Sequence, residues 1–360
     1  MTDIINLIES AGLTGRGGAA FPTATKLRAA GLNRAQLIVN ACDGEIGAAK
    51  DAWVVATRLP ELVEGTELLR PAGSPAPLFA AHRDSVTARI LAREGLPVLE
   101  VPDRYVSSEE SALVSLAHGW TARPIAKTGH TAEGFRDGRG RRVHPTLVLN
   151  AETVWRAAQI ARRGADWFRA QGTAAEPGPR LVSVSGSVRR PTVVETAAGT
   201  PLTELLEAAG GPDPAARYLG IGGLGGVVVG IGEALGASWQ SSSLARFGAS
   251  TGPGILTVWD PAQDPLDTVS QLLAFGASES AGQCGPCMFG LPALETLWSQ
   301  FRMRPDRRTE TSLVHGIERV EGRGACHHPD GVAHFLRSAV RVFGPELMAG
   351  AGLDDELGLR

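Results

Sequence analysis

The sequence predicts a mixed α/β protein built from three parts, and three observations indicate this. Short apolar strands alternate with helical segments between residues 4 and 101. Apolar and polar residues then alternate with a period of two at residues 181–185, as in a half-buried strand. The last part of the chain has mainly helical spacing. We place the parts at residues 1–172, 178–262 and 263–360, joined first by the Gly- and Pro-rich stretch 172–179.

The first part is predicted to contain a parallel sheet. Residues 4–10 favour a short helix, and Pro22 lies near the start of a second helix, where its missing N–H costs nothing. Short apolar strands are expected at residues 36–40, 77–81 and 98–101, with a helix at 85–93. Because strand, helix and strand at this spacing form a βαβ unit, we expect the strands to be parallel.

The second part is predicted to be a small α+β unit. Strands are expected at residues 181–185, 193–195 and 255–259, and a short helix begins at Thr200-Pro201 and stops at Gly210-Gly211. The pattern Gly220 to Gly225 fits G-x-G-x-x-G, but the strand-forming Val227 to Val229 follows it. A dinucleotide fingerprint needs a helix N-terminus there, so we do not predict a phosphate site.

The third part is predicted to be a helical bundle. Asp330 is placed to cap a helix that has one apolar face. The residues of that face are Val332, Phe335, Leu336, Ala339 and Phe343. This spacing is typical of an amphipathic helix packed against others.

Charge and hydropathy exclude several classes of protein. The net charge of −3 suggests neither a nucleic-acid binder nor a protein of the membrane surface. No apolar run approaches the ~20 residues that cross a bilayer, so we expect no transmembrane segment. The residues Met1-Thr2-Asp3 lack the pattern of a signal peptide. We therefore expect a cytoplasmic, reduced protein.

Three of the four cysteines suggest a metal or redox site. Cys284 and Cys287 form a Cys-x2-Cys pair that places two thiols on one turn, and Cys326 follows near the start of another helical segment. Cys42 lies far from them in sequence, and a small buried residue is its expected role, with a redox thiol as the alternative. Thiolates are the ligands of iron–sulfur clusters and of zinc. Two alternatives remain: zinc held with His327 or His328, and three buried apolar cysteines.

A Gly-rich loop suggests an anion site near the N-terminus. Gly15, Arg16, Gly17 and Gly18 run into a helix start, which presents backbone N–H groups to an anion. Lys26 lies one turn into that helix and can add a charge. An ordinary tight turn is the alternative.

The cysteine segment resembles one protein family. Residues 279–287, followed by Cys326, are similar to the Glu-Ser-Cys-Gly-x-Cys-x-Pro-Cys motif and distant cysteine of the NADH-binding flavoprotein subunit of respiratory complex I. The diaphorase subunits of NAD-linked hydrogenases and formate dehydrogenases share this motif. In the family four cysteines hold a [4Fe–4S] cluster, but the first position is Ala281 here. The resemblance leaves open a fourth ligand from elsewhere such as His327 or His328, an iron open to water, a [3Fe–4S] cluster, or no cluster.

The Gly-rich loop resembles the FMN loop of the same family, and three more segments are similar to flavin- and nicotinamide-contacting stretches. The resemblance implies cofactor binding by Gly15, Arg16, Gly17, Gly18, Lys26, Asn40, Asp43, Ser108, Glu109 and Asn150. It implies catalytic roles for Glu45, Glu109 and Glu110, and metal ligation by Cys284, Cys287 and Cys326. The chain departs from the family pattern at Ala20, Cys42, Asp43, Ser108 and Leu149.

The resemblance covers roughly residues 8 to 345 and implies a fold and a function. It implies an α/β flavin-binding Rossmann-like domain, a ubiquitin-like β-grasp domain of the soluble-ligand-binding type, and a helical iron–sulfur domain. The implied activity is electron transfer from NAD(P)H through FMN and a [4Fe–4S] cluster to a ferredoxin, another small electron-transfer protein, a quinone-linked acceptor or a membrane-bound redox complex. Because only 14 residues precede Gly15, we expect a standalone member.

Two alternatives to this function remain. The first is an electron relay that has lost nicotinamide binding, and the second is a non-redox metal-binding scaffold. The stretch from Lys127 to Val143 is basic and Gly-rich where the family has an aromatic, Pro-rich stretch. It is either a solvated loop or a docking face for an acidic partner.

Overall fold

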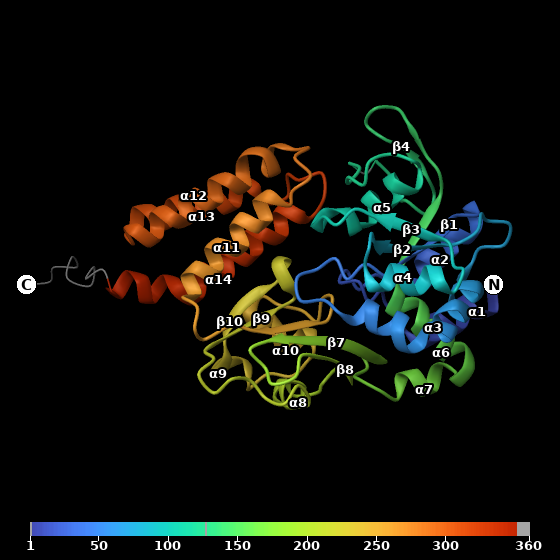
Figure 1. Cartoon of the computed structure of the whole chain (residues 1–360), viewed down its shortest axis with the longest axis horizontal. Coiled ribbons are helices and arrows are strands. Elements are labelled where there is room, and N and C mark those ends of the chain that lie inside the picture. The colour runs from blue at the N-terminus through green and yellow to red at the C-terminus, as the bar shows by residue number, and fades with distance from the viewer. Residues whose placement is uncertain (1, 127, 351–360) are drawn as a thin grey trace, which may run out of the picture.

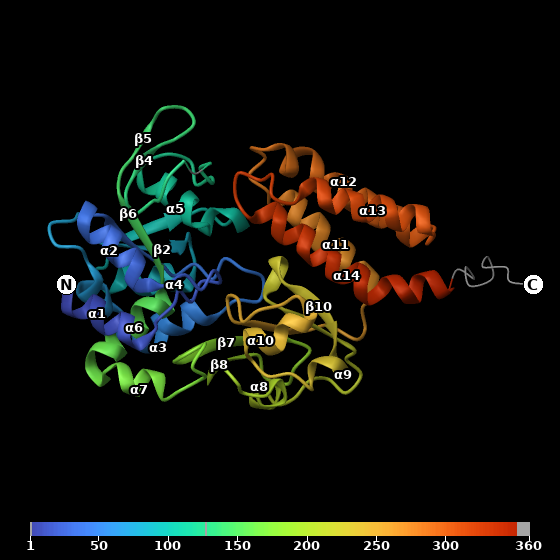
Figure 2. The same cartoon turned by 180° about the vertical axis from the view of Figure 1, so that it is seen from behind.

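The computed structural model describes residues 2–126 and 128–350 and arranges them as three parts around a common junction (Figure 1). Met1, Lys127 and residues 351–360, on which some of the sequence predictions fall, lie outside the described residues. The α/β part lies at one end, the small mixed sheet lies beside it, and the C-terminal helices project to the other side. The loop that follows the first strand extends from the α/β part toward the other two in both views (Figures 1 and 2).

The α/β part contains a four-stranded parallel sheet in the order β3-β2-β1-β6, which confirms the predicted parallel pairing. Its strands are β1 (Gln36–Asn40), β2 (Leu78–His82), β3 (Val98–Val101) and β6 (Thr146–Asn150). Its helices are α1 (Thr2–Ala11), α2 (Thr23–Asn33), α3 (Lys50–Leu69), α4 (Val86–Arg93), α5 (Glu110–Ala117), α6 (Ala151–Arg163) and α7 (Ala165–Arg169). A 3₁₀ turn (Tyr105–Ser108) precedes α5, and a small hairpin pairs β4 (Phe135–Arg136) with β5 (Arg142–Val143).

Alternation along the strands explains how both faces of this sheet are covered. Leu37 and Val39 point into a core shared with Trp155 of α6, whereas Ile38 points to the other face, where Leu113 of α5 is buried. Because all four strands are parallel, their carboxyl ends meet at one edge of the sheet. The chain leaves β1 toward β2 on one side and returns as β6 on the other, which is where open α/β sheets bind ligands.

The second part is a five-stranded mixed sheet in the order β10-β9-β11-β7-β8. Its strands are β7 (Pro179–Gly186), β8 (Thr192–Ala197), β9 (Tyr218–Ile221), β10 (Val227–Gly230) and β11 (Ile255–Val258). Its helices are α8 (Leu202–Ala208), α9 (Ile231–Ala234) and α10 (Ser241–Leu244), with 3₁₀ turns at Gly223–Gly225 and Ala245–Phe247. The parallel pair β7 and β11 lies centrally, and α8 buries its leucines against the sheet. This arrangement is a β-grasp fold, as the resemblance implied.

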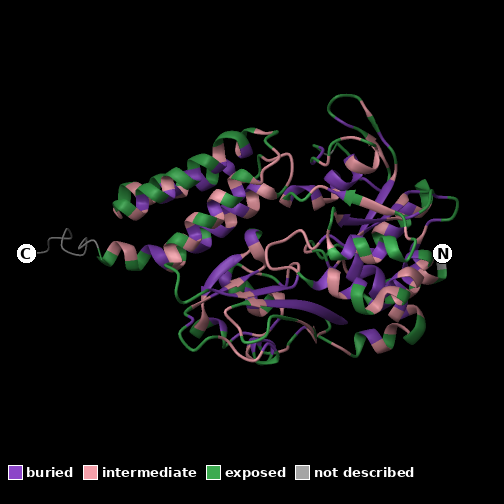
Figure 3. Cartoon of the chain, in the orientation of Figure 1, coloured by how far each residue is buried: buried purple, intermediate pink, exposed green. Residues whose placement is uncertain are grey.

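The third part is helical, as predicted. It contains α11 (Pro265–Ser278), a π-helical turn η4 (Pro286–Gly290), α12 (Leu291–Met303), α13 (Arg307–Val320) and α14 (His328–Gly350). The predicted apolar face of α14 is buried against the other helices, and Figure 3 shows buried residues along the inner sides of these helices. None of the helices within the described residues is long and apolar enough to cross a bilayer.

The start of α14 differs from the prediction. The helix begins at His328, so Asp330 lies inside its first turn and does not cap it. The Asp330 carboxylate instead accepts a hydrogen bond from the backbone N–H of Gly322, at 2.8 Å. A carboxylate in the first turn also interacts favourably with the helix dipole. Asp330 therefore ties the beginning of the α13–α14 connection to the start of α14.

Candidate functional site

A cavity of about 570 Å³ lies where the three parts meet. The α/β part contributes the segments after β1 and at the end of β6, the β-grasp sheet contributes the turn Gly223–Gly225, and the helical part contributes the start of α14. This volume lies in the ~300–1,000 Å³ range of small-molecule sites. The cavity is therefore large enough for a cofactor, and it adjoins the ligand-binding edge of the parallel sheet.

The structure brings many of the predicted site residues to this cavity. Those that line it are Gly17, Asn40, Asp43, Glu45, Ser108, Glu109, Asn150 and Cys326. Those that lie outside its lining are Gly15, Arg16, Gly18, Lys26, Glu110, Cys284 and Cys287. Leu224 and its neighbours also line it, although the 220–225 pattern carries no helix N-terminus. The turn at residues 220–225, for which the sequence predicts no phosphate site, is thus part of the cavity wall.

The buried side chain of Arg16 faces the linker. Its guanidinium donates to the carbonyls of Pro177 and Pro179, at 3.1 and 3.3 Å, while its backbone N–H donates to Thr153 Oγ1. Burial lowers the pKa of the Arg16 guanidinium to about 9. The Arg16 side chain therefore fixes the Gly-rich loop against residues 177–179 and does not reach the cavity.

Lys50, the first residue of α3, connects the Gly-rich loop to the end of β6. Its Nζ donates to the Arg16 carbonyl at 2.7 Å, to Asn150 Oδ1 at 3.0 Å and to Glu152 Oε2 at 2.8 Å. Lys50 and Glu152 are almost fully buried, with side chains 4% and 1% exposed. Burial alone would raise the pKa of Glu152, but Lys50, Arg156 and Arg16 hold it below its usual value. This ion pair fixes two walls of the cavity.

Two buried carboxyls, Asp43 and Asp51, lie beside this ion pair. Asp43 has a left-handed φ of 49°, and its carboxylate accepts the N–H groups of Asp51 and Ala52 at 2.9 and 2.7 Å. It therefore caps the start of α3. The Asp51 carboxylate accepts both hydrogen bonds from the side-chain amide of Asn150. Burial raises the pKa of both groups, that of Asp51 to about 7.

We expect Asp51 to make stability decline as pH rises. A carboxyl whose pKa is higher in the folded chain stabilises the fold fully below its unfolded pKa of ~4, and that contribution is lost as pH rises to about 7. Asp51→Asn should flatten this decline, leaving the smaller part due to Asp43. Urea unfolding between pH ~4 and ~7.5 measures it. An unchanged pH profile in the variant would show that Asp51 is not the titrating group.

Gly44 and Ser108 lie in direct contact on the cavity wall. A Cβ added to Gly44 would lie 1.8 Å from Ser108 Oγ and 2.7 Å from Ser108 Cβ. The side-chain amide of Asn40 donates to the Ser108 carbonyl at 3.0 Å and holds the two segments together. Asp43, the residue before Gly44, has a left-handed φ. Any side chain at position 44 must therefore push the 105–108 turn outward.

Gly44→Ala should destabilise the chain by about 1–3 kcal/mol, the typical cost of overpacking. Ser108→Gly removes both atoms that the new methyl group meets, so the double variant should recover most of the loss. Denaturant unfolding of both single variants and the double variant measures this coupling. Additive effects of the two changes would contradict the contact.

Glu45 joins the α/β part to the β-grasp part, and its partner Tyr105 extends the connection to the helical part. Its carboxylate accepts the hydroxyl of Tyr105 at 2.6 Å and the backbone N–H groups of Ile46 and Leu224 at 2.9 and 2.8 Å. Burial raises the pKa of Glu45. The Tyr105 N–H in turn donates to Glu279, the first residue of the cysteine motif. Tyr105 and Glu279 are not among the predicted site residues, although Glu279 begins the motif at residues 279–287.

The other predicted acids occupy the α5 side of the cavity. Glu109 caps α5, since its carboxylate accepts the N–H groups of Ser111 and Ala112 at 2.8 and 3.1 Å. Glu110 pairs with Lys26 at 2.9 Å, and both side chains are partly exposed. Lys26 thus neutralises Glu110. The catalytic roles that the resemblance implies for Glu45, Glu109 and Glu110 stay predictions.

The three C-terminal cysteines come together at the junction. Cys284 precedes the π-helical turn that contains Cys287, and Cys326 precedes α14. Burial, followed by the proximity of Cys284 and Cys326, raises the pKa of Cys287 to about 12. Burial likewise raises the pKa of Cys326 to about 11. Cys326 also lines the cavity, so a group bound by these thiols would lie next to a ligand there.

Zinc and an iron–sulfur cluster place different demands on the spacing of these cysteines. Within residues 2–126 and 128–350, no group of three His, Cys, Asp or Glu side chains is close enough to hold a single metal ion. The cysteines of an iron–sulfur cluster bind different iron atoms, so their sulfurs lie farther apart. His327 is almost fully exposed, and His328 uses Nε2 on the Gly276 carbonyl at 2.7 Å.

Comparison with known families matches each part of the chain separately. Residues 8–159 match the Nuo51 FMN-binding domain, residues 181–232 match the SLBB domain, and residues 267–350 match the iron–sulfur binding region of NADH-ubiquinone oxidoreductase-F. The chain is 29% identical over 383 residues to the NADH-quinone oxidoreductase F-subunit 2 of Rhizobium meliloti, covering 96% of this chain and 88% of the relative. It is 28% identical to the corresponding F-subunit of Mycobacterium tuberculosis, with 96% and 84% covered. The chain is similar to these F subunits along almost its whole length.

The chain is also similar to a solved structure. An NAD⁺-reducing [NiFe]-hydrogenase in its H₂-reduced state superposes with a TM-score of 0.83 at 28% identity. The match covers 97% of this chain but only 62% of the hydrogenase chain. The chain therefore spans less than two thirds of that protein.

The residues of the cavity fit FMN, and those of the cysteine site fit an iron–sulfur cluster in part. The cavity has the volume of a cofactor site, Gly17 lies at its wall, and amide side chains of Asn40 and Asn150 reach it. At the cysteine site, Cys284, Cys287 and Cys326 supply three thiols, whereas the alanine at 281 supplies no donor atom. The cysteine donor set is thus one short of the family's four.

Proposed function

We propose that the chain takes electrons from NADH or NADPH into FMN in the cavity and passes them through an iron–sulfur centre to a separate redox protein. One observation carries this proposal: Cys326 belongs both to the cysteine group and to the cavity wall. A flavin there and a centre on the cysteines would be neighbours. The relatives, subunits of NADH-quinone oxidoreductases and of a hydrogenase, support a redox partner.

In this proposal the side chains of the cavity position and shield the cofactor. When bound, FMN converts the two electrons of a nicotinamide hydride into single electrons, which the iron–sulfur centre carries onward. Asn40 and Asn150 line the cavity, and hydrogen bonds to Ser108 and from Lys50 hold their side chains in place. Glu45 and Tyr105 close the side toward α14 and exclude water. All four cysteines have free thiols, which favours a location in the reducing cytoplasm.

A second candidate function is an electron relay without nicotinamide binding. The observation that favours it is the position of Asp43, where the family has a longer glutamate. Both of its carboxylate oxygens are used on the N–H groups of Asp51 and Ala52. A carboxylate committed to capping α3 is less available to a nicotinamide ribose.

Cofactor content tests the first half of the proposal. The protein is purified anaerobically, and flavin, iron and acid-labile sulfide are counted per chain. We expect about one flavin per chain, together with iron and sulfide in equal amounts. Protein that binds zinc and neither flavin nor sulfide would contradict both candidate functions and favour a scaffold.

A further inference from the structure

Two exposed apolar side chains directly follow a cysteine of the proposed centre. Met288 and Phe289 lie in η4 next to Cys287, and their surfaces are 52% and 71% exposed. Isolated exposed apolar residues are common on protein surfaces, so exposure alone assigns no role. Their position is the informative feature, because Cys287 is buried one residue away. The surface closest to this cysteine along the chain is therefore apolar.

A second hollow connects the cysteine loops to the β4–β5 hairpin. Its volume is about 230 Å³, and Gln283 and Ala325, the neighbours of Cys284 and Cys326, line it together with Arg123 and Arg139. The Gln283 side chain donates to the Pro124 carbonyl at 2.9 Å, which fixes the two segments together. Both views show the loops before α12 and α14 turned toward this hairpin (Figures 1 and 2).

The rim of this hollow is strongly basic. Arg123 and Arg139 line the hollow and are exposed, and so are Arg136 and Arg142 of the adjoining hairpin and Arg323 in the loop that leads to Cys326. Between residues 128 and 144 the acids are Glu133, which is exposed, and Asp137, which is buried and bound by the N–H groups of Arg139 and Arg141. This local positive charge is opposite in sign to the chain's net charge of −3.

The hollow is also held in a fixed shape. The guanidinium of Arg141 stacks on Trp120 at 3.8 Å from the ring centre and donates to Asp137 at 2.7 Å. The Asp137 backbone pairs with that of Arg141. A basic surface on such a support differs from a solvated loop, because the backbone that carries the arginines is held by these contacts. Fixed charges next to an apolar patch suit transient docking, in which charge guides approach and apolar contact adds affinity.

We propose that η4 and the arginine-rimmed hollow form the docking face for a small acidic protein that carries a one-electron centre. The inference rests on the proposed function, since it places the exit of electrons at the cysteine loops. Charge complementarity selects the acidic partner. Arg123 and Arg139 attract its acidic surface, and Phe289 supplies the apolar contact beside Cys287.

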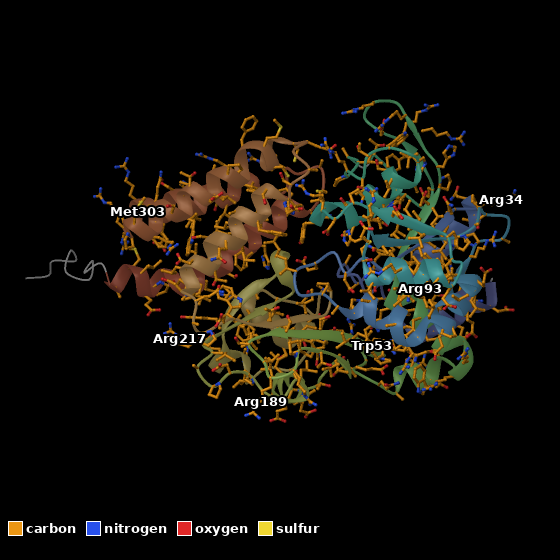
Figure 4. All side chains as sticks on the ribbon, viewed as in Figure 1. Arg34, Trp53, Arg93, Arg189, Arg217 and Met303 are labelled. Atoms are coloured by element: carbon orange, nitrogen blue, oxygen red, sulfur yellow. The ribbon has the colours of Figure 1, made fainter. Side chains whose placement is uncertain are left out.

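Binding of a plant-type [2Fe–2S] ferredoxin, an acidic one-electron carrier, tests the proposal. Its affinity for the whole protein is measured by calorimetry at low and high salt. We expect binding at low salt that weakens about tenfold or more in high salt and in Arg139→Glu, and that also weakens in Phe289→Glu. Arg189→Glu and Met303→Glu change exposed residues elsewhere on the molecule and should leave binding unchanged (Figure 4).

Three results would overturn the docking face. They are no ferredoxin binding at low salt, equal weakening by the Arg189 and Met303 controls, and self-association of the chain that Phe289→Glu abolishes while ferredoxin binding persists. The last result would assign the face to a second copy. Since binding is measured without NADH, its outcome is independent of whether NADH reduces the protein. A failure of the docking face can thus be separated from a failure of the proposed function.

Discussion

Replacing Lys50 by methionine should lower the free energy of unfolding by about 3–5 kcal/mol and abolish flavin binding. The substitution leaves the Glu152 carboxylate buried without its closest cation, 2.8 Å away. It also removes hydrogen bonds to the Arg16 carbonyl and to Asn150, so the Gly-rich loop and the end of β6 lose their common anchor. Urea unfolding and flavin content of the purified variant measure the two effects.

The matched control is Lys26→Met. Lys26 also forms an ion pair with a glutamate, at 2.9 Å, but both side chains are about a third exposed. Exposed pairs contribute only about 0–1 kcal/mol, so stability should change little. The double variant Lys50→Met/Glu152→Gln should regain part of the lost stability, because no buried charge is left unpaired at position 152. Equal losses in Lys26→Met and Lys50→Met would contradict this explanation.

Cys287→Ala should remove nearly all bound iron while flavin stays bound. Cys287 is a buried member of the cysteine group, and losing it leaves two thiols, fewer than a stable cluster requires. The flavin cavity does not include Cys287, so its walls should persist. Iron analysis and the visible spectrum measure the outcome. Cys42→Ala, in the separate core beneath the sheet, is the control and should retain iron.

Ala281→Cys should increase the amount of iron bound per chain. It supplies a fourth thiol at the family's position, so iron per chain should rise toward about four and survive exposure to air longer. Electron paramagnetic resonance of the two proteins should differ if the natural centre has three protein thiolates. Identical spectra and iron contents would show that another side chain already supplies the fourth ligand.

Local patterns in the sequence predicted much of the fold. The strands at 36–40 and 98–101 match the structure to the residue, because short, mainly apolar runs are typical of strands in a parallel sheet covered on both faces. The strand expected at 77–81 lies one residue later, and the last small-sheet strand ends at Val258. The sequence of α3 has no clear helical pattern, since Pro60 interrupts it. In the structure, Arg58 has a non-helical φ within this helix. Proline normally ends a helix, and here the helix bends instead.

The candidate site was predictable only where family motifs carried it. The motifs indicated eight residues that line the cavity, whereas the contacts that assemble it are long-range. Leu224 donates to Glu45 across 179 positions in sequence, and Tyr105 contacts Glu279 across 174. No local pattern encodes such pairs. The turn at 220–225 illustrates this, because its sequence predicts the strand that follows it but not that tertiary packing places the turn on the cavity wall.

The central proposal is electron flow from nicotinamide through flavin to the cysteine-bound centre. An absorption spectrum of anaerobically purified protein, recorded before and after adding NADH, tests it most directly. The proposal predicts flavin and iron–sulfur bands that both bleach on adding NADH. Bands that persist with NADH but bleach with reduced ferredoxin would favour the relay, and a colourless protein would contradict electron transfer by this chain.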